Sequence, residues 1–452
     1  MARAGYASVT SEVAPASLQQ TALLHALDSL PSSTAAYNLA GGVRFRRQAD
    51  AALLRRGLHA IVQRHETLRT TLERSGDTFL QRIHRRGDLA WAEHDHRDVP
   101  AERRAALIRE HAMSESRSPV DLADVRRLRV RLLRFADDDL ALVIGTHHVG
   151  FDGHSATLLW AELWAWYGVA AGLPVDDPLP HLPYQYRDYA AWQREPANAV
   201  IEEDLAYWHA HLPRPLPRLD LPFGPAPDAG DLVVPPRVQI GLDAERRREL
   251  QERSRQLGVS VFALIVAGLA LQLWQATGQE EIVVGTPTAS RRDPRFGGLI
   301  GFFANVVLLR LEVRPMERFR DVALRVGRRL LEATAHDAAY ITQVLERVAP
   351  GRGTTVDISI SDRLSGRSPR SDFSPVEIVE GIDVVPMRGE LRYQVLSTGP
   401  GIELTMDYRA GALSPAGAGR WLDGLLAAID SGTRDPDLPL CRLEAGAPTR
   451  LG

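Results

Sequence analysis

The sequence predicts an α/β protein with more than one domain. Strand-like and helix-like apolar patterns alternate on both sides of two proline-rich stretches, residues 172–183 and 212–236. The chain has 452 residues, which is long for a single hydrophobic core and suggests two or three domains. We therefore expect a first domain over residues 1–178 and a second part over residues 179–452.

The first part alternates strands and helices in order. Short apolar runs predict strands, and an apolar face that returns every three or four residues predicts helices. The expected elements are a strand at residues 42–45, a helix over 51–64, strands at 79–84 and 128–135, and a buried strand at 140–144 that precedes a helix from about residue 155. The second proline-rich stretch contains eight prolines and predicts an extended surface connector.

The alternation resumes after that connector. The expected elements are a strand at 237–242, a helix over 244–257, an apolar helix over 259–277, a strand at 281–285, a buried strand within 300–313, hairpin-like strands at 391–395 and 402–408, and a closing helix over 415–430. No internal sequence repeat is visible.

The most informative segment is HHVGFDG, residues 147–153, between the buried strand and its helix. Neighbouring side chains on an extended segment point to opposite faces, so one histidine can enter a cleft while the other stays in the scaffold. Histidine can accept a proton at neutral pH, and Gly153 can offer its backbone N–H to an oxyanion. A buried Asp152 needs a partner, for which arginine is the natural candidate. The segment predicts a general-base site without a covalent nucleophile, or, as the alternative, two hydrogen-bonded scaffold histidines.

Composition excludes several other chemistries. All 54 basic residues are arginine, so a lysine Schiff base, a pyridoxal-phosphate anchor and a Walker phosphate loop are excluded. Cys441 is the only cysteine, which allows no internal disulfide or thiolate cluster. The formal charge of −3 gives no reason to expect nucleic acid or an anionic membrane as a partner. GxSxG, HExxH and GxGxxG motifs are absent.

Metal binding and membrane insertion are not expected. His94 and His96 are two residues apart, as are His209 and His211, and this spacing suits a metal ion only on a strand. The N-terminus lacks the apolar core of a signal peptide, and the longest apolar segment, residues 259–274, is short for a membrane span. These features predict a cytoplasmic protein.

HHVGFDG matches the HHxxxDG pattern of the chloramphenicol acetyltransferase-like superfamily, and the chain resembles the condensation domains of nonribosomal peptide synthetases. Four further segments agree in the family's order: RHETLRT at 64–70, YRDYAAW at 186–192, GTP at 285–287 with Arg291, and IGFFAN at 300–305 with Arg310. The resemblance covers residues 17–430. It implies two acetyltransferase-like lobes that form a V-shaped pseudo-dimer around a central tunnel.

The resemblance also implies roles for individual residues. His148 matches the catalytic position, where it deprotonates or orients an amine or hydroxyl that attacks an acyl thioester. Gly153 is expected to stabilise the oxyanion. His147 and Asp152 are expected to be structural, with Arg291 as the salt-bridge partner of Asp152.

The substrate tunnel is expected to be lined by three residues: His154, Ser155 and Asn305. His154 stands where the family usually has an aromatic residue such as tryptophan. Other departures are residues 17–24, which lack the family's arginine and tryptophan, residues 336–340, which keep part of a histidine motif, and residues 353–358, where a further motif is not recognisable. These departures cluster where substrates and neighbouring domains are expected to touch.

The resemblance implies no bound cofactor. The donor is expected to be an acyl or peptidyl carrier protein that supplies its thioester on phosphopantetheine, and the acceptor a small molecule or a second carrier-bound group. Arginine-rich helical faces at 103–109, 246–255 and 318–329 could guide carrier docking, or could be ordinary solvated faces.

Four aromatic residues follow the motif at helical spacing: Trp160, Trp164, Trp166 and Tyr167. They fall on the apolar stripe of one helix, so we expect them to serve mainly core packing.

We expect a monomeric, free-standing condensation enzyme of secondary metabolism, such as antibiotic biosynthesis, because nothing resembling an adenylation or carrier domain follows. The DxxxxD that replaces the histidine motif in heterocyclising relatives is absent, since residues 147–153 keep both histidines. Two alternatives stay open: a carrier-independent O-acyltransferase that uses acyl coenzyme A, and a non-catalytic recruitment platform. The plant-type DFGWG is missing, and both motif histidines are retained.

Overall fold

The computed structural model describes residues 11–28, 35–45, 49–172, 179–195, 198–223, 235–350, 358–363, 377–384, 389–398 and 400–443. The chain forms two compact units. The first comprises Met1–Asn198, Arg291–Ala304 and Arg367–Val385, and the second comprises Ala199–Ser290, Asn305–Gly366 and Pro386–Gly452.

This division differs from the single boundary at 178/179 that the sequence predicts. Two later segments belong to the first unit because their backbone groups bond to it. Phe303 and Ala304 donate to Asp152, and residues 377–384 pair with an early strand. Parts of both proline-rich stretches, and residues 353–357 of the unrecognised motif, lie outside the described residues.

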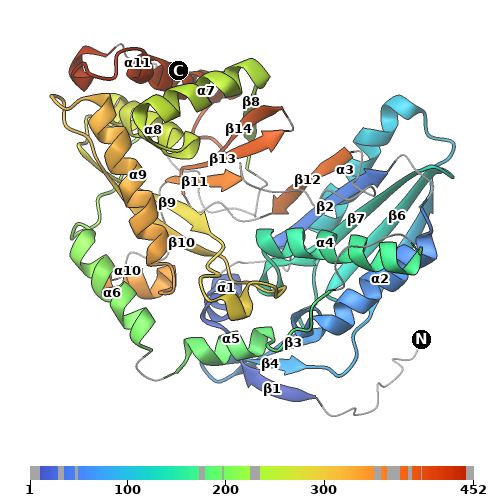
Figure 1. Cartoon of the computed structure of the whole chain (residues 1–452). Coiled ribbons are helices and arrows are strands. Elements are labelled where there is room, and N and C mark those ends of the chain that lie inside the picture. The colour runs from blue at the N-terminus through green and yellow to red at the C-terminus, as the bar shows by residue number, and fades with distance from the viewer. Residues whose placement is uncertain are drawn as a thin grey trace. The chain divides into compact units, whose positions relative to one another are not determined.

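The main sheet of the first unit has the strand order β12-β2-β7-β6-β5 (Figure 1). Its strands are β2 (Asn38–Phe45), β5 (Leu89–Asp95), β6 (Leu128–Ala136), β7 (Asp139–His147) and β12 (Glu377–Val384). All neighbours are antiparallel except β5 and β6. The central strand β7 ends at the histidine motif, and all nine of its residues are buried.

Helices on both faces of this sheet explain the unbroken apolar run of β7. On one face lie α2 (Ala51–Arg64) and α4 (Gly153–Ala170), and Leu142 of β7 shares their hydrophobic cluster. On the other lies α3 (Ala101–Arg117), whose Ile108 clusters with Val143. Alternate residues of β7 therefore serve two cores, and the strand is fixed from both sides.

A smaller sheet completes the first unit, with the order β1-β4-β3. Its strands are β1 (Glu12–Pro15), β3 (Thr70–Ser75) and β4 (Thr78–Ile83), and the helices α1 (Leu18–Asp28) and α5 (Tyr186–Gln193) accompany it. An aromatic cluster joins Tyr186 and Tyr189 of α5 to Phe296, Phe302 and Phe303. This cluster anchors the late segment 291–304 within the first unit.

The second unit is built on a six-stranded sheet with the order β10-β9-β11-β13-β14-β8. Its strands are β8 (Arg237–Leu242), β9 (Glu281–Thr288), β10 (Asn305–Glu312), β11 (Ile358–Arg363), β13 (Leu391–Thr398) and β14 (Gly401–Tyr408). Its helices are α6 (Ala199–His211), α7 (Ala244–Leu257), α8 (Val261–Thr277), α9 (Phe319–Ala335), α10 (Ile341–Val348) and α11 (Pro415–Arg434). Strand β11 is parallel to β9 and β13, and the other pairs are antiparallel.

Helix α8 lies at the centre of this unit's core, and its residues from Phe262 to Leu273 are all buried. Among the described residues, no single helix is long and apolar enough to cross a membrane. The bent pair α7 and α8, at 86°, passes that test by length and composition only.

Most of the expected elements are present. The helices at 51–64 and 244–257 and the strand at 237–242 have the expected bounds, and β13 and β14 form the expected hairpin. The buried strand expected within 300–313 begins only at Asn305, because residues 300–304 form an irregular segment of the first unit. No sequence pattern indicated β12, whose partner β2 lies more than 300 residues earlier in the chain.

Candidate active site

The motif forms the predicted strand–turn–helix. Strand β7 ends at His147, the single-turn 3-10 helix His148–Gly150 follows, and α4 begins at Gly153. Asp152 caps α4, accepting from the backbone N–H of Ser155 at 2.8 Å. The backbone N–H of His148 donates to the carbonyl of Tyr37 at 2.9 Å, which ties the turn to the start of β2.

His147 has the contacts of a scaffold residue. It is 2% exposed, its Nε2 lies 2.9 Å from the carbonyl oxygen of Ala36, and its Nδ1 accepts from the N–H of Val149 at 3.1 Å. Both contacts are satisfied only by a neutral ring protonated at Nε2. Burial, reinforced by the charge of Arg127, lowers the pKa of His147 to about 3. This ring therefore stays uncharged at neutral pH.

His148 is less buried than His147 and has different contacts. Its half-buried ring lies with its centroid 4.3 Å from that of Phe302, at an interplanar angle of 52°. Among the described residues, its buried Nδ1 has no hydrogen-bond partner and no carboxylate bonds to the ring. His148 is thus positioned by its backbone and by an aromatic contact, and its imidazole is not committed to the scaffold.

Asp152 is a structural hub that is only 1% exposed. One carboxylate oxygen accepts from Ser155 N, Ser155 Oγ and Arg291 Nη2 at 2.7–2.8 Å. The other accepts from the backbone N–H groups of Phe303 and Ala304 at 3.0 and 3.1 Å. Five donors satisfy the carboxylate, so it has no spare capacity for proton transfer, and it joins the late segment to the motif.

Arg291 forms the ion pair with Asp152 that the sequence predicts, and both residues belong to the first unit. Its guanidinium carbon also lies 4.0 Å from the centre of the Phe303 ring. Burial lowers the pKa of Arg291, and the nearby Asp152 opposes this shift. The Nε and Nη1 atoms are buried and have no partner within the described ranges, so the side chain is held mainly by one charged bond and one aromatic face.

Ser155 does not line open space, contrary to the prediction. It is fully buried, and its hydroxyl lies within hydrogen-bond distance of Asp152 Oδ1, the Gly301 carbonyl and the Gly301 N–H. Gly301 itself must be glycine, because a Cβ there would lie 2.2 Å from Tyr186. Ser155 therefore joins α4 to the late segment, and its place at the third position of α4 turns it inward.

Gly153 and His154 are exposed at the start of α4. A Cβ on Gly153 would meet no atom within 4 Å, so packing does not explain this glycine. Its position in the first turn leaves its N–H without a helical carbonyl partner. The Nε2 of His154 lies 3.3 Å from the carbonyl oxygen of Gly297, and partial burial of its ring lowers its pKa. Both are free to face a ligand.

Asn305 also differs from the predicted tunnel residue. It is 3% exposed and lies in the second unit. Its Nδ2 donates to the carbonyls of Asp337 and Ala339 at 2.9 and 2.8 Å, and its Oδ1 accepts from the N–H groups of Val306 and Ile341. All four of its hydrogen-bonding positions are filled by backbone, because it links the start of β10 to the segment before α10.

Sequence reasoning missed two groups that hold the turn. Gln20 of α1 donates from Nε2 to the carbonyl of Val149 at 3.0 Å, and the Tyr186 hydroxyl donates to the carbonyl of Phe302 at 2.6 Å. Gln20 lies in the opening segment, residues 17–24, which lacks the family's arginine and tryptophan but has two adjacent glutamines. The adjacent pair Gln19–Gln20 is the sequence signal that could have indicated this contact, and the structure buries both side chains.

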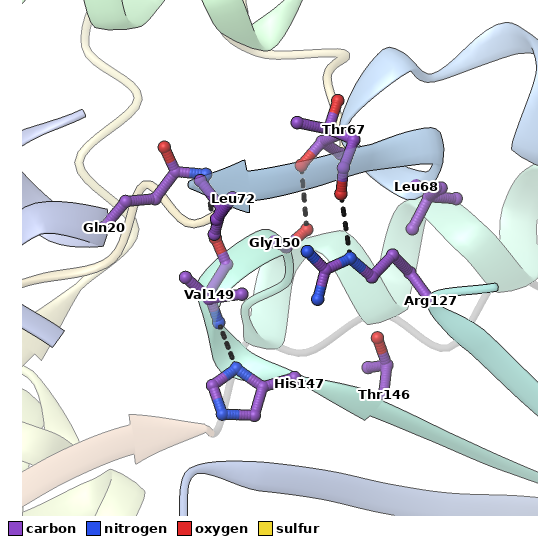
Figure 2. Close-up of a pocket in the computed structure, with 10 residues that line it drawn as sticks. Gln20, Thr67, Leu68, Leu72, Arg127, Thr146, His147, Val149 and Gly150 are labelled. Atoms are coloured by element: carbon purple, nitrogen blue, oxygen red, sulfur yellow. Dashed lines mark hydrogen bonds between the residues drawn. The ribbon is translucent and has the colours of Figure 1, made fainter. Parts of the chain in front are cut away.

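A cavity of about 10 Å³ lies behind the turn, between His147, Gly150, Thr67 and Arg127 (Figure 2). Arg127 is buried and donates to the carbonyls of Thr70 and Leu122 at 2.8 and 2.6 Å, while its Nη1 has no partner in the described part of the chain. Burial lowers its pKa to about 10, so it remains a cation at neutral pH. The cavity is the size of one water molecule and admits no substrate.

No group of three or more histidine, cysteine, aspartate or glutamate side chains in the described part of the chain could hold a metal ion. His94 and His96 do meet a third histidine, His111 of α3, whose Nε2 lies 3.2 Å from that of His96. Burial lowers the pKa of His111 to about 4.

A family model described as condensation domain matches residues 10–446. One of the linear gramicidin synthase proteins of Brevibacillus parabrevis is 30% identical over 384 residues, which cover 84% of this chain and 5% of that protein. Phosphinothricin tripeptide synthetase PhsC of Streptomyces viridochromogenes is 32% identical over 330 residues, covering 73% and 30%. The chain belongs to the condensation-domain family, as its motifs predict, and it spans a small part of these relatives.

Solved structures share the fold. The condensation domain of the Monacolin K polyketide synthase MokA has a TM-score of 0.80 at 19% identity, covering 96% of this chain and 100% of that one. The SgcC5 protein of Streptomyces globisporus has a TM-score of 0.79 at 24% identity, covering 94% and 100%. The predicted chloramphenicol acetyltransferase-like α/β fold class is confirmed.

Proposed function

We propose that this chain transfers an acyl or aminoacyl group from a carrier-protein thioester to an amine or alcohol. One of the relatives that it matches is a tripeptide synthetase by name, which favours an amide product. The single observation that carries the proposal is the contrast between the two motif histidines. The ring of His147 is fully bonded and neutral, whereas that of His148 is held beside Phe302 with its polar atoms uncommitted.

In this reaction the acceptor nitrogen or oxygen attacks the thioester carbonyl carbon. The new bond forms as the carbonyl π electrons move to oxygen, and the C–S bond breaks as the carbonyl reforms. His148 accepts or orients the proton that the acceptor loses, and the departing phosphopantetheine thiolate takes up one proton. Positioned base catalysis of this kind contributes roughly 10²- to 10⁴-fold.

Gly153 is suited to stabilise the oxyanion. Its N–H lies in the first turn of α4, where backbone N–H groups point out of the helix and the helix dipole favours negative charge. The space where its side chain would lie is open. One such donor is worth about 2.7–4 kcal/mol in other enzymes.

His148→Ala tests the proposal. With an acyl-loaded carrier protein as donor and mass spectrometry of the product, we expect product formation to fall at least about 100-fold while circular dichroism stays unchanged. His181→Ala is the matched control, because it removes an exposed histidine of the first unit that lies outside the motif. Equal turnover by His148→Ala and the control would contradict the proposed role.

The donor is tested separately. Carrier-bound and coenzyme A thioesters of one acyl group should differ in kcat/KM, with the carrier favoured. Equal values would favour the O-acyltransferase. Binding of partner proteins without turnover by the wild-type chain would favour the recruitment platform. A cytoplasmic, monomeric protein without a bound cofactor remains part of the proposal.

A further inference from the structure

A groove of about 710 Å³ lies on the surface of the first unit between α2 and α4. It is lined by residues 53–60 of α2, by Asp88 and Leu89, and by residues 166–170 at the end of α4. It is therefore separate from the motif turn, which precedes the first residue of α4, Gly153. Figure 1 shows the two helices running side by side across the sheet. The site described above uses none of the residues that line this groove.

The floor of the groove is apolar. Gly57 of α2 brings the helices together, since a Cβ there would lie 3.0 Å from Leu163 and 3.5 Å from Trp166. Trp166 and Val169 of α4 are 39% and 59% exposed, although Trp164 and Tyr167 of the same helix are buried. The sequence prediction that these aromatic residues serve mainly the core therefore fails for Trp166. Apolar side chains gathered on an open surface are typical of an interaction site.

The edge of the groove is basic. Arg55 and Arg56 are exposed, and neither has an ion-pair partner among the described residues. Of the described residues that line the groove, Asp88 alone is acidic. The loop that carries Asp88 also contains exposed Arg85 and Arg86, which likewise have no acidic partner in the described part of the chain.

The arginine-rich helical faces at residues 103–109, 246–255 and 318–329 differ from the edge of this groove. Their arginines pair with nearby acidic residues: Arg103 with Glu110, Arg246 with Glu249, Arg253 with Asp430, Arg325 with Glu317, and Arg329 with Glu332. These pairs neutralise part of the charge on the three faces, whereas neither Arg55 nor Arg56 of the groove has an ion-pair partner among the described residues. At the groove, an acidic partner can therefore supply the carboxylates that Arg55 and Arg56 lack among the described residues.

We propose that the groove binds an acidic amphipathic helix of a partner protein. The apolar face of that helix would pack on Trp166 and Val169, and its carboxylates would pair with Arg55 and Arg56. Two packed helices with an apolar floor between them form the kind of surface on which helix-in-groove recognition operates. The proposal does not depend on the reaction, because binding here needs neither thioester nor acceptor.

A synthetic amphipathic peptide tests this surface. The probe has about 18 residues, long enough to form a helix, with glutamate on one face and leucine on the other. With 5-fluorotryptophan in the protein, its binding should shift the ¹⁹F resonance of Trp166 among the eight tryptophans, and Trp166→Phe assigns that resonance. Affinity should fall as salt is raised from about 0.05 to 0.5 M.

Variants separate this site from general attraction of an acid to arginine. Arg55→Glu/Arg56→Glu should weaken binding about tenfold or more, whereas Arg103→Glu/Arg109→Glu on α3 makes the same change in net charge and should leave it within about twofold. Val169→Asp, at an exposed position, should also weaken binding. The proposal is overturned if both double variants behave alike, if a lysine version of the peptide binds equally, or if light scattering shows a dimer of this chain that Val169→Asp dissociates.

Discussion

The neutral state of His147 predicts a specific acid sensitivity. In the folded chain the pKa of His147 is about 3, because burial and Arg127 oppose protonation, whereas an unfolded histidine has a pKa of about 6.5. The folded state therefore binds fewer protons than the unfolded state between these two values. The stability that this group contributes is complete above pH 6.5 and is lost as the pH falls from 6.5 toward 3.

The magnitude follows from the two pKa values. From pH 7 to pH 4.5 the unfolded histidine becomes almost fully protonated and the folded one does not. Linkage then gives a loss of about 2–3 kcal/mol from this residue. The result depends mainly on the unfolded pKa, because the folded pKa lies more than a unit below pH 4.5.

His147→Asn isolates this contribution. Its Oδ1 can still accept from the N–H of Val149, but the bond to the Ala36 carbonyl is lost, which costs about 1–2 kcal/mol at pH 7. The variant does not titrate, so it should become the more stable protein below about pH 5. Guanidinium unfolding followed by tryptophan fluorescence at pH 7, 5.5 and 4.5 measures both curves. His59→Asn, at an exposed position, is the control.

The reasoning would be refuted by a constant difference in unfolding free energy between wild type and His147→Asn across this range. That outcome would mean that His147 takes up a proton in the folded state as easily as in the unfolded one. It would also remove the physical distinction between His147 and His148 on which the proposed function rests.

Three further predictions concern Arg291, Asn305 and Gly153. Arg291→Met leaves Asp152 buried without its cation and should cost about 3–5 kcal/mol in urea unfolding, whereas Arg292→Met at an exposed neighbour should cost far less. Asn305→Ala leaves four backbone groups without partners and should cost at least about 2 kcal/mol, and an unchanged unfolding midpoint would contradict its structural role. Gly153→Ala should change stability by less than about 1 kcal/mol, because its Cβ enters open space, and a larger loss would show that packing requires this glycine.

The local structure was largely predictable. The helix at 51–64 has a complete apolar stripe and an Asp50 cap, and the helix at 244–257 lies between Asp243 and a left-handed Gly258. Such signals act within a few residues, so the sequence states them directly. The Arg291–Asp152 pair was also expected, though on the ground of family resemblance rather than from the spacing of the residues.

Burial was harder to predict than secondary structure. Ser155 and Asn305 were expected to face substrate. The polar atoms of both side chains are instead occupied by hydrogen bonds to segments distant in the chain. A small polar residue beside a catalytic motif has the same appearance in the sequence whether it faces solvent or backbone. Tertiary contacts decide whether such a residue faces solvent or backbone. Gly301 approaches Ser155, and the segment before α10 approaches Asn305.

The sequence by itself determined the order of strands and helices, the family, and the strand–turn–helix that carries the two histidines, because these depend on local patterns and on motifs. The tertiary structure decided which histidine is free. The carbonyl of Ala36, the cation of Arg127 and the ring of Phe302 come from three distant segments, and together they keep His147 neutral and bonded and leave His148 uncommitted. The physical reason is that a side chain's protonation and exposure depend on all the groups packed around it, whatever their separation in the chain.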